Sequence, residues 1–190
     1  MKDDKIILFD CFGLFVKDPF VEFFNRRYGK DGPRLKDHFC MGADLGKCDK
    51  DELFQQMEGE LSLDKELIAN ELKRISTPIQ EMIELAKKCK RRHPVYLLSN
   101  CIKGMIEFIF DGTSFSECFD GEFRSYDLGL IKPGREIYDF VMKSLSPIDE
   151  IYFFDDNPAN LIEAKNAGIE AILFKDVPSC EKELVARGLL

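Results

Sequence analysis

Two stretches decide the fold: Lys5-Ile6-Ile7-Leu8-Phe9-Asp10, close to the N-terminus, and Ile151-Tyr152-Phe153-Phe154-Asp155-Asp156. Each contains a short, continuous run of aliphatic or aromatic residues, which is typical of a strand buried on both faces. Each run ends in carboxylates. In an open α/β sheet the chemistry takes place at the carboxyl ends of the strands. The two stretches therefore predict three acidic side chains gathered at one edge of a sheet.

Further apolar runs of the same kind lie at Val95–Leu98 and Glu170–Phe174, with a weaker one at Gly121–Phe123. Helical patterns separate them. Thr77 is expected to cap one helix, with Pro78 at its first position and Gln80 completing the capping box. Asn157 is expected to cap a second, and a third follows Pro133-Gly134. Strands that alternate with helices predict an α/β fold with a doubly wound, parallel, Rossmann-like sheet.

The stretch from residue 16 to residue 76 has a different character. It contains no convincing strand, and its periodic segments predict helices at Phe20–Tyr28, Lys50–Glu58 and Leu63–Ile75. We therefore expect two domains: a core made of residues 1–15 and 77–190, and a small helical cap made of residues 16–76. An insert at this point lies over the strand ends, where it can act as a lid.

Composition narrows the class of protein. The chain has 190 residues, 45% of them hydrophobic, and a net charge of −8, so we expect neither a nucleic-acid nor a membrane partner. No signal-peptide pattern precedes the first strand, which predicts a cytoplasmic protein. Seven cysteines without a C-x-x-C pair favour free thiols over disulfides or zinc. With two histidines, neither beside a nucleophile motif, a histidine-based triad is disfavoured.

Asp10 is the candidate nucleophile. A carboxylate at a strand end can attack phosphorus and form an aspartyl-phosphate. Both groups are anionic, so a magnesium ion is needed between them to remove the repulsion and polarise the phosphoryl oxygens. Mg²⁺ prefers oxygen ligands and takes one or two protein carboxylates beside water and phosphate. Asp10 and Asp156 would suffice as these carboxylates.

Two further segments supply groups that suit phosphate chemistry. Ser99 and Asn100 follow the strand at Val95–Leu98 and offer a hydroxyl and an amide as hydrogen-bond donors. Lys132 lies in a loop just before a helix, where an ammonium group can offset charge on the nucleophile and on the phosphoryl group. The order along the chain is therefore Asp, Ser-Asn, Lys-Pro and Asp-Asp.

This order of motifs resembles the haloacid dehalogenase (HAD) superfamily of aspartate-nucleophile hydrolases, over essentially the whole chain. The four stretches that carry the resemblance are Phe9-Asp10, Leu98-Ser99-Asn100, Asp127-Leu128-Gly129 with Ile131-Lys132-Pro133, and Phe153-Phe154-Asp155-Asp156-Asn157. The last two look most like the alpha-glucose-1-phosphate phosphatase-like branch. That branch carries a small helical cap after its first motif, which agrees with the insert expected at residues 16–76.

The resemblance implies roles for individual residues. The implied magnesium ligands are Asp10, the backbone carbonyl of Phe12, Asp156 and, through water, Asp155. The residues implied to hold phosphate are Ser99, Asn100 and Lys132, the last of which also steadies the nucleophile. The implied function is that of a Mg²⁺-dependent phosphomonoester hydrolase. Its expected partner is a small phosphorylated metabolite, such as a sugar phosphate, and its intermediate an aspartyl-phosphate on Asp10.

Phe12 departs from the pattern of the resemblance. Many phosphatases of the superfamily place a second aspartate there, which protonates the leaving oxygen and later activates water. Phe12 supplies no proton, so we expect either a slow phosphatase or a catalytically impaired protein that binds phosphorylated ligands. A phosphomutase is disfavoured for the same reason, and a dehalogenase by the acidic pair Asp155-Asp156, which it does not need.

The sequence leaves the substrate-facing residues of the cap open. Candidates to reach a substrate are Arg26, Arg27, His38 and Met41. Their side-chain directions do not follow from the sequence, and neither do the substrate or the oligomeric state.

Overall fold

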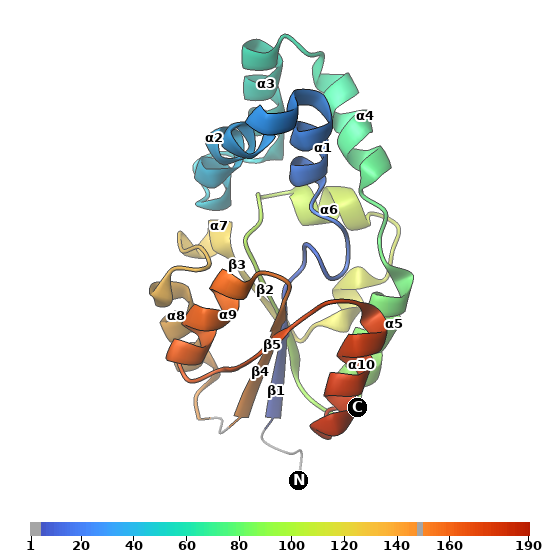
Figure 1. Ribbon diagram of the computed structural model, residues 1–190, viewed down its shortest axis with the longest axis vertical. Helices are drawn as coiled ribbons and strands as arrows, with labels where there is room; N and C mark the ends of the chain where they lie inside the picture. The colour runs from blue at the N-terminus through green and yellow to red at the C-terminus, as the bar shows by residue number, and fades with distance from the viewer. Residues whose placement is uncertain (1–4, 148–149) are drawn as a thin grey trace.

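The computed structural model describes residues 5–147 and 150–190 as a parallel sheet with helices on both faces and further helices above one end (Figure 1). In the described part of the chain the strand order is β3-β2-β1-β4-β5, all neighbours being parallel. The strands are β1 (Lys5–Phe9), β2 (Val95–Ser99), β3 (Gly121–Arg124), β4 (Glu150–Asp155) and β5 (Glu170–Leu173). The predicted doubly wound α/β sheet is confirmed, with each strand within one residue of its expected bounds.

Alternate residues of β1 enter two separate cores. Ile7 and Phe9 face the core that contains α5 (Gln80–Lys90) and α10 (Val177–Ala186). Ile6 and Leu8 face the core that contains α8 (Arg135–Leu145) and α9 (Pro158–Asn166), on the other side of the sheet. A strand buried on both faces explains why its sequence is a continuous apolar run. Since β1 is the central strand of the five, its carboxyl end lies at the centre of the sheet edge.

Four helices lie over the carboxyl ends of the strands (Figure 1). They are α1 (Pro19–Tyr28), α2 (Gly32–Asp44), α3 (Lys50–Leu61) and α4 (Lys65–Ile75). The range 16–76, all of it described, contributes no strand to the sheet. The separation into a core and a cap at these boundaries remains our proposal, and we call α1 to α4 the cap.

The sequence did not predict α2. Its start, Gly32-Pro33, has the composition of a turn, but a proline in the first helical turn removes only an N–H that has no partner within the helix. Three other elements were also missed: α6 (Met105–Phe110), α7 (Ser125–Leu128) and α10. The first two are short, so they show little periodicity.

The predicted capping of α5 by Thr77 is wrong. The helix begins at Gln80, its N-cap is Ile79, and no side chain caps it. The N–H of Ile79 instead donates to the carbonyl of Phe15 (2.7 Å), so the chain is still extended where it returns from the cap to the core. The other predicted cap is confirmed: Asn157 accepts from the N–H of Ala159 at the start of α9.

The structure also bears on the cysteines and on membrane-spanning helices. All seven cysteines are free, and six of them are buried. Among the described residues, no helix combines the length and the apolar character that crossing a membrane requires.

Candidate active site

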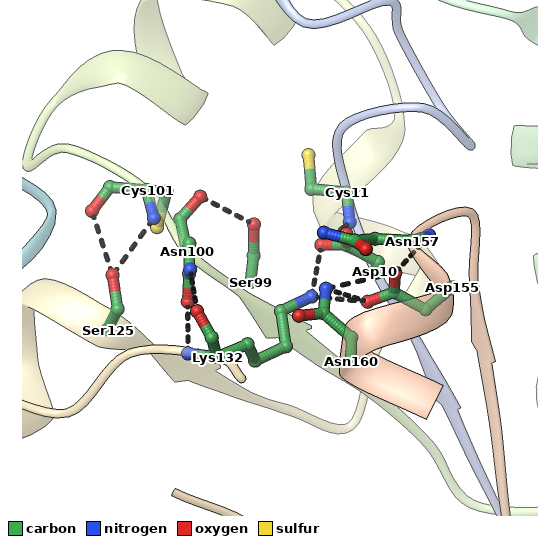
Figure 2. A network of polar contacts seen from close by, with 10 residues as sticks. All are labelled: Asp10, Cys11, Ser99, Asn100, Cys101, Ser125, Lys132, Asp155, Asn157 and Asn160. Carbon is green, nitrogen blue, oxygen red and sulfur yellow. Dashed lines mark hydrogen bonds and ion pairs between the residues drawn. The ribbon is translucent and has the colours of Figure 1, made fainter. Parts of the chain in front are cut away.

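Asp10 lies directly after β1, at the centre of the edge that the cap covers (Figures 1 and 2). Its backbone N–H donates to the carbonyl of Phe154 (3.0 Å), which continues the pairing of β1 with β4. One carboxylate oxygen accepts from the N–H of Cys11 (2.7 Å) and lies 2.9 Å from Lys132 Nζ. No hydrogen bond to the other oxygen occurs among the described residues. That oxygen is therefore the one available for chemistry.

Lys132 bridges two carboxylates in the interior (Figure 2). Its Nζ lies 2.9 Å from Asp10 Oδ1 and 2.7 Å from Asp155 Oδ2, and its side chain is buried. Nζ is also 5.2 Å from the centre of the Phe153 ring. A charge removed from water is stable only if it is paired and hydrogen-bonded, and both conditions are met here.

Asn100 holds the loop that carries Lys132. Its Nδ2 donates to the Lys132 carbonyl (2.8 Å), and its Oδ1 accepts from the Lys132 N–H (2.8 Å). The sequence suggested that this amide binds phosphate. In the structure both ends of the amide are engaged with the backbone of Lys132, so Asn100 positions the lysine. Its neighbour Ser99 is completely buried, and its hydroxyl lies 3.3 Å from the Asn100 carbonyl.

Asp155 anchors the lysine rather than facing the cavity. Its side chain is 0% exposed. Apart from Lys132, its oxygens accept from the N–H of Asn157 (2.7 Å) and from Asn160 Nδ2 (2.9 and 3.0 Å). Sequence reasoning missed Asn160. Its signal is the spacing: it follows the N-cap Asn157 by three residues, which places it in the first turn of α9 beside Asp155.

Asp156 completes an acidic cluster with Asp10 and Asp155, whose nearest oxygens all lie within 4.8 Å of one another. Gly13 makes room for it. A Cβ at this position would lie 2.1 Å from Asp156 Oδ2, and the glycine has a φ of +89°, which other residues rarely adopt. The donor set consists of carboxylate oxygens, the ligands that Mg²⁺ prefers.

Burial and neighbouring charges shift the pKa values in the centre of the site. Burial raises the pKa of Asp10 to about 7, although Lys132 opposes this shift. Burial alone would lower the pKa of Lys132, but the carboxylates of Asp10 and Asp155 outweigh it and raise this pKa. Lys132 therefore carries its charge. A further cation beside Asp10 would favour the ionised form of that carboxyl group.

The acidic cluster opens into a cavity of about 720 Å³ between the cap and the core. From the core it is lined by Asp10, Gly13, Asn100, Lys132 and Asp156, and from the cap by residues that include Asp18, Lys36 and Asp44. Phe12, half-buried, lies in its wall beside Asp10. The proton-donating aspartate of related motifs is thus replaced by an apolar ring at the cavity surface.

None of the cap residues suggested by the sequence lines the cavity. Arg26 pairs with Glu22, Arg27 with Glu71, and His38 Nε2 lies 2.7 Å from Glu60 Oε2. Met41 is exposed. Two charged residues that do line it, Lys36 and Asp44, are on α2, the helix that the sequence did not predict.

Fold and site together define an α/β protein with a parallel sheet and an aspartate at the end of its first strand. The family model of haloacid dehalogenase-like hydrolases matches residues 5–168. The chain belongs to this family, as its motifs indicated.

Among curated proteins, the chain is 30% identical over 150 residues to D-ribitol-5-phosphate phosphatase from Bacteroides thetaiotaomicron, covering 66% of this chain and 73% of the relative. It is 27% identical over 120 residues to drimenol cyclase from Aspergillus calidoustus, covering 62% of this chain. The chain spans only 23% of that relative's length.

Solved structures share the fold. A HAD family enzyme from Bacteroides thetaiotaomicron, in complex with magnesium and inorganic phosphate, superposes with a TM-score of 0.75 at 20% identity and covers 90% of this chain and 94% of its own. A predicted HAD-like hydrolase from Porphyromonas gingivalis gives 0.74 at 18% identity, covering 97% and 98%. At these identities the likeness establishes the fold alone.

Proposed function

We propose that this protein is a Mg²⁺-dependent phosphomonoester hydrolase that acts through an aspartyl-phosphate on Asp10. The observation that carries this proposal is the buried ammonium of Lys132, 2.9 Å from Asp10 and 2.7 Å from Asp155, beside the carboxylate of Asp156. A nucleophile, a fixed positive charge and a carboxylate donor set thus meet at one cavity.

The residues that would hold magnesium are Asp10 and Asp156, with the backbone carbonyl of Phe12. Asp155 would act at most through water, because Lys132, Asn157 and Asn160 already occupy its oxygens. Magnesium at this position would favour the ionised form of Asp10 and neutralise charge on the phosphoryl oxygens.

The reaction has two steps. In the first, the unpaired oxygen of Asp10 attacks phosphorus, and the bond from phosphorus to the ester oxygen breaks. The departing oxygen takes its proton from water, because Phe12 offers none. In the second, a water molecule attacks phosphorus, and the bond from phosphorus to the Asp10 oxygen breaks, which releases inorganic phosphate and restores the carboxylate. The proton lost by the attacking water neutralises the hydroxide left by the first step. Lys132 stabilises the phosphoryl oxygens in both steps.

The size of the cavity and the curated relative support a small sugar or polyol phosphate as the substrate. About 720 Å³ lies within the range of sites that bind small molecules. The relative that is 30% identical over most of its length is a phosphatase of D-ribitol 5-phosphate. We therefore place alditol phosphates and sugar phosphates first among candidate substrates.

One observation favours a second function. Phe12 leaves the nucleophile without an adjacent acid, and such a residue typically contributes about 10²–10⁴ in rate. A protein that binds phosphorylated ligands with little turnover would have this arrangement. The leaving group separates the two functions, since nitrophenolate departs without a proton and an alkoxide does not.

The test is phosphate release from ribitol 5-phosphate, sugar phosphates and p-nitrophenyl phosphate, with Mg²⁺ and after chelation. We expect Mg²⁺-dependent release that falls at least about 10⁴-fold in Asp10→Asn, since the covalent step is then lost. Asp37→Asn, which changes an exposed carboxylate on α2, is the matched control and should retain full activity.

Each outcome decides between the two functions. Release from p-nitrophenyl phosphate alone would favour the impaired protein. No release from a folded protein that binds Mg²⁺ and phosphate would contradict the hydrolase, and unchanged release from Asp10→Asn would contradict Asp10 as the nucleophile.

Gly13→Ala is expected to weaken Mg²⁺ binding by about tenfold or more. The added methyl group would lie 2.1 Å from Asp156 Oδ2, so the carboxylate must move away from its position beside Asp10. Calorimetric titration with Mg²⁺ measures the change directly.

Gly129→Ala is the matched control. Gly129 also has a positive φ, +63°, but nothing lies within 4 Å of the added Cβ. Both variants should lose about 1 kcal/mol of folding stability from the strained backbone, and only Gly13→Ala should lose Mg²⁺ affinity. Equal Mg²⁺ affinities in the two variants would show that the close approach of Gly13 to Asp156 does not shape the metal site.

A further inference from the structure

Among the charged side chains on the cap side of the cavity, Asp18, Lys36 and Asp44 act on one another electrostatically. Two of them are already engaged. Lys36 Nζ lies 3.2 Å from Asp18 Oδ2, and Asp18 Oδ1 caps α1 by accepting from the N–H groups of Phe20 and Val21. These contacts fix both side chains at the N-terminus of α1.

Asp44 differs from these two neighbours. No hydrogen bond or ion pair of its carboxyl group occurs among the described residues, and the residue is half-buried in the wall of the cavity. Burial raises the pKa of Asp44 to about 7, with the charge of Lys36 opposing this shift and that of Asp18 adding to it. A carboxyl group that is partly removed from water and has no hydrogen-bond partner costs free energy, and a donor on a ligand would offset that cost.

The backbone at Asp44 is held firmly against the core. Its carbonyl accepts from Ser125 Oγ (2.6 Å), and the same hydroxyl accepts from the N–H of Cys101 (3.0 Å). Two residues on, Gly46 approaches the core so closely that a Cβ would lie 2.5 Å from the carbonyl oxygen of Tyr126. The backbone that carries the Asp44 side chain is therefore held in place beside the cavity.

We propose that Asp44 and Lys36 recognise a hydroxyl group on the part of the substrate remote from the phosphate, and so select polyol or sugar phosphates. This inference rests on the proposed phosphatase function. A hydroxyl both donates and accepts, so it can donate to the Asp44 carboxyl and accept from Lys36.

Other substrate ends fit this pair poorly. A carboxylate or second phosphate would be repelled by Asp44 and Asp18. An ammonium group would be attracted by Asp44 but would offer Lys36 no acceptor, so phosphoethanolamine is the competing ligand that the test includes. An apolar end would leave the Asp44 carboxyl buried without a partner, which sites built for hydroxyl groups discriminate against strongly. The hydroxyl is the group that satisfies both side chains.

The test compares ligand binding in the Asp10→Asn background, which removes turnover from the comparison. Calorimetry with Mg²⁺ present would measure ribitol 5-phosphate, phosphoethanolamine and inorganic phosphate. We expect Asp44→Ala to weaken ribitol 5-phosphate about tenfold and to leave inorganic phosphate unchanged. Asp44→Asn keeps the shape of the side chain and serves if the alanine variant does not fold. Asp37→Ala, exposed on the same helix, should change neither affinity.

Several results would overturn the proposal. Two concern Asp44→Ala: the same loss of affinity for ribitol 5-phosphate and for inorganic phosphate, or no change in either affinity. Two concern the Asp10→Asn protein itself: tighter binding of phosphoethanolamine than of ribitol 5-phosphate, or binding of inorganic phosphate with no binding of ribitol 5-phosphate. Failure of the phosphatase itself is seen separately, as absence of phosphate release from the wild-type protein. The binding comparison would still decide the role of Asp44 in that case.

Discussion

Lys132→Met is expected to destabilise the protein by about 3–5 kcal/mol and to reduce turnover at least about 10²-fold. The stability loss follows because methionine fills a similar volume but leaves Asp10 and Asp155 facing each other without their shared cation. The loss of turnover follows because the fixed charge beside the nucleophile is gone when charge builds on the phosphoryl oxygens. Urea unfolding and steady-state kinetics measure the two effects.

A double variant separates these effects. Adding Asp155→Asn removes one of the two carboxylates that Lys132 neutralised, so stability should partly recover while turnover stays low. Lys143→Met, on the exposed face of α8, is the control and should be close to wild type in both measurements. Recovery of turnover together with stability would show that Lys132 serves folding alone.

The parts of the fold that the sequence predicted are those governed by local pattern. The strands β1 and β4 are continuous apolar runs because both faces of the sheet are covered, and their carboxylates follow directly at the strand ends. Once the sheet is parallel, its geometry brings Asp10, Asp155 and Asp156 to one edge. This much requires no knowledge of side-chain direction.

The parts that the sequence missed depend on contacts between distant segments. The amide of Asn100 bonds to the backbone of Lys132, 32 residues away, a positioning contact that the sequence does not reveal. Its binding of phosphate stays a prediction. Helix α2 begins in a Gly-Pro turn, and the side chains it presents to the cavity, Lys36 and Asp44, follow from how the cap is placed on the core. Periodicity carries no information on that placement.

Phe12→Asp is expected to raise turnover of alkyl phosphates by about 10²–10⁴-fold, the usual contribution of a positioned general acid. Position 12 lines the cavity beside Asp10, and its side chain replaces the acid found there in many related phosphatases. Turnover of p-nitrophenyl phosphate should rise far less, because nitrophenolate leaves without a proton. The ratio of the two rates, measured as kcat/KM across a series of leaving groups, is therefore the readout.

Phe12→Asn is the matched control, because asparagine has the size and polarity of aspartate but no carboxylic proton. If both variants accelerate alkyl phosphates equally, the gain comes from removing the bulk of the phenyl ring, and Phe12 acts by crowding the leaving group. If only Phe12→Asp accelerates them, the wild-type protein is a phosphatase that lacks its acid. No gain in either variant, with p-nitrophenyl phosphate still hydrolysed, would mean that another group already supplies the proton.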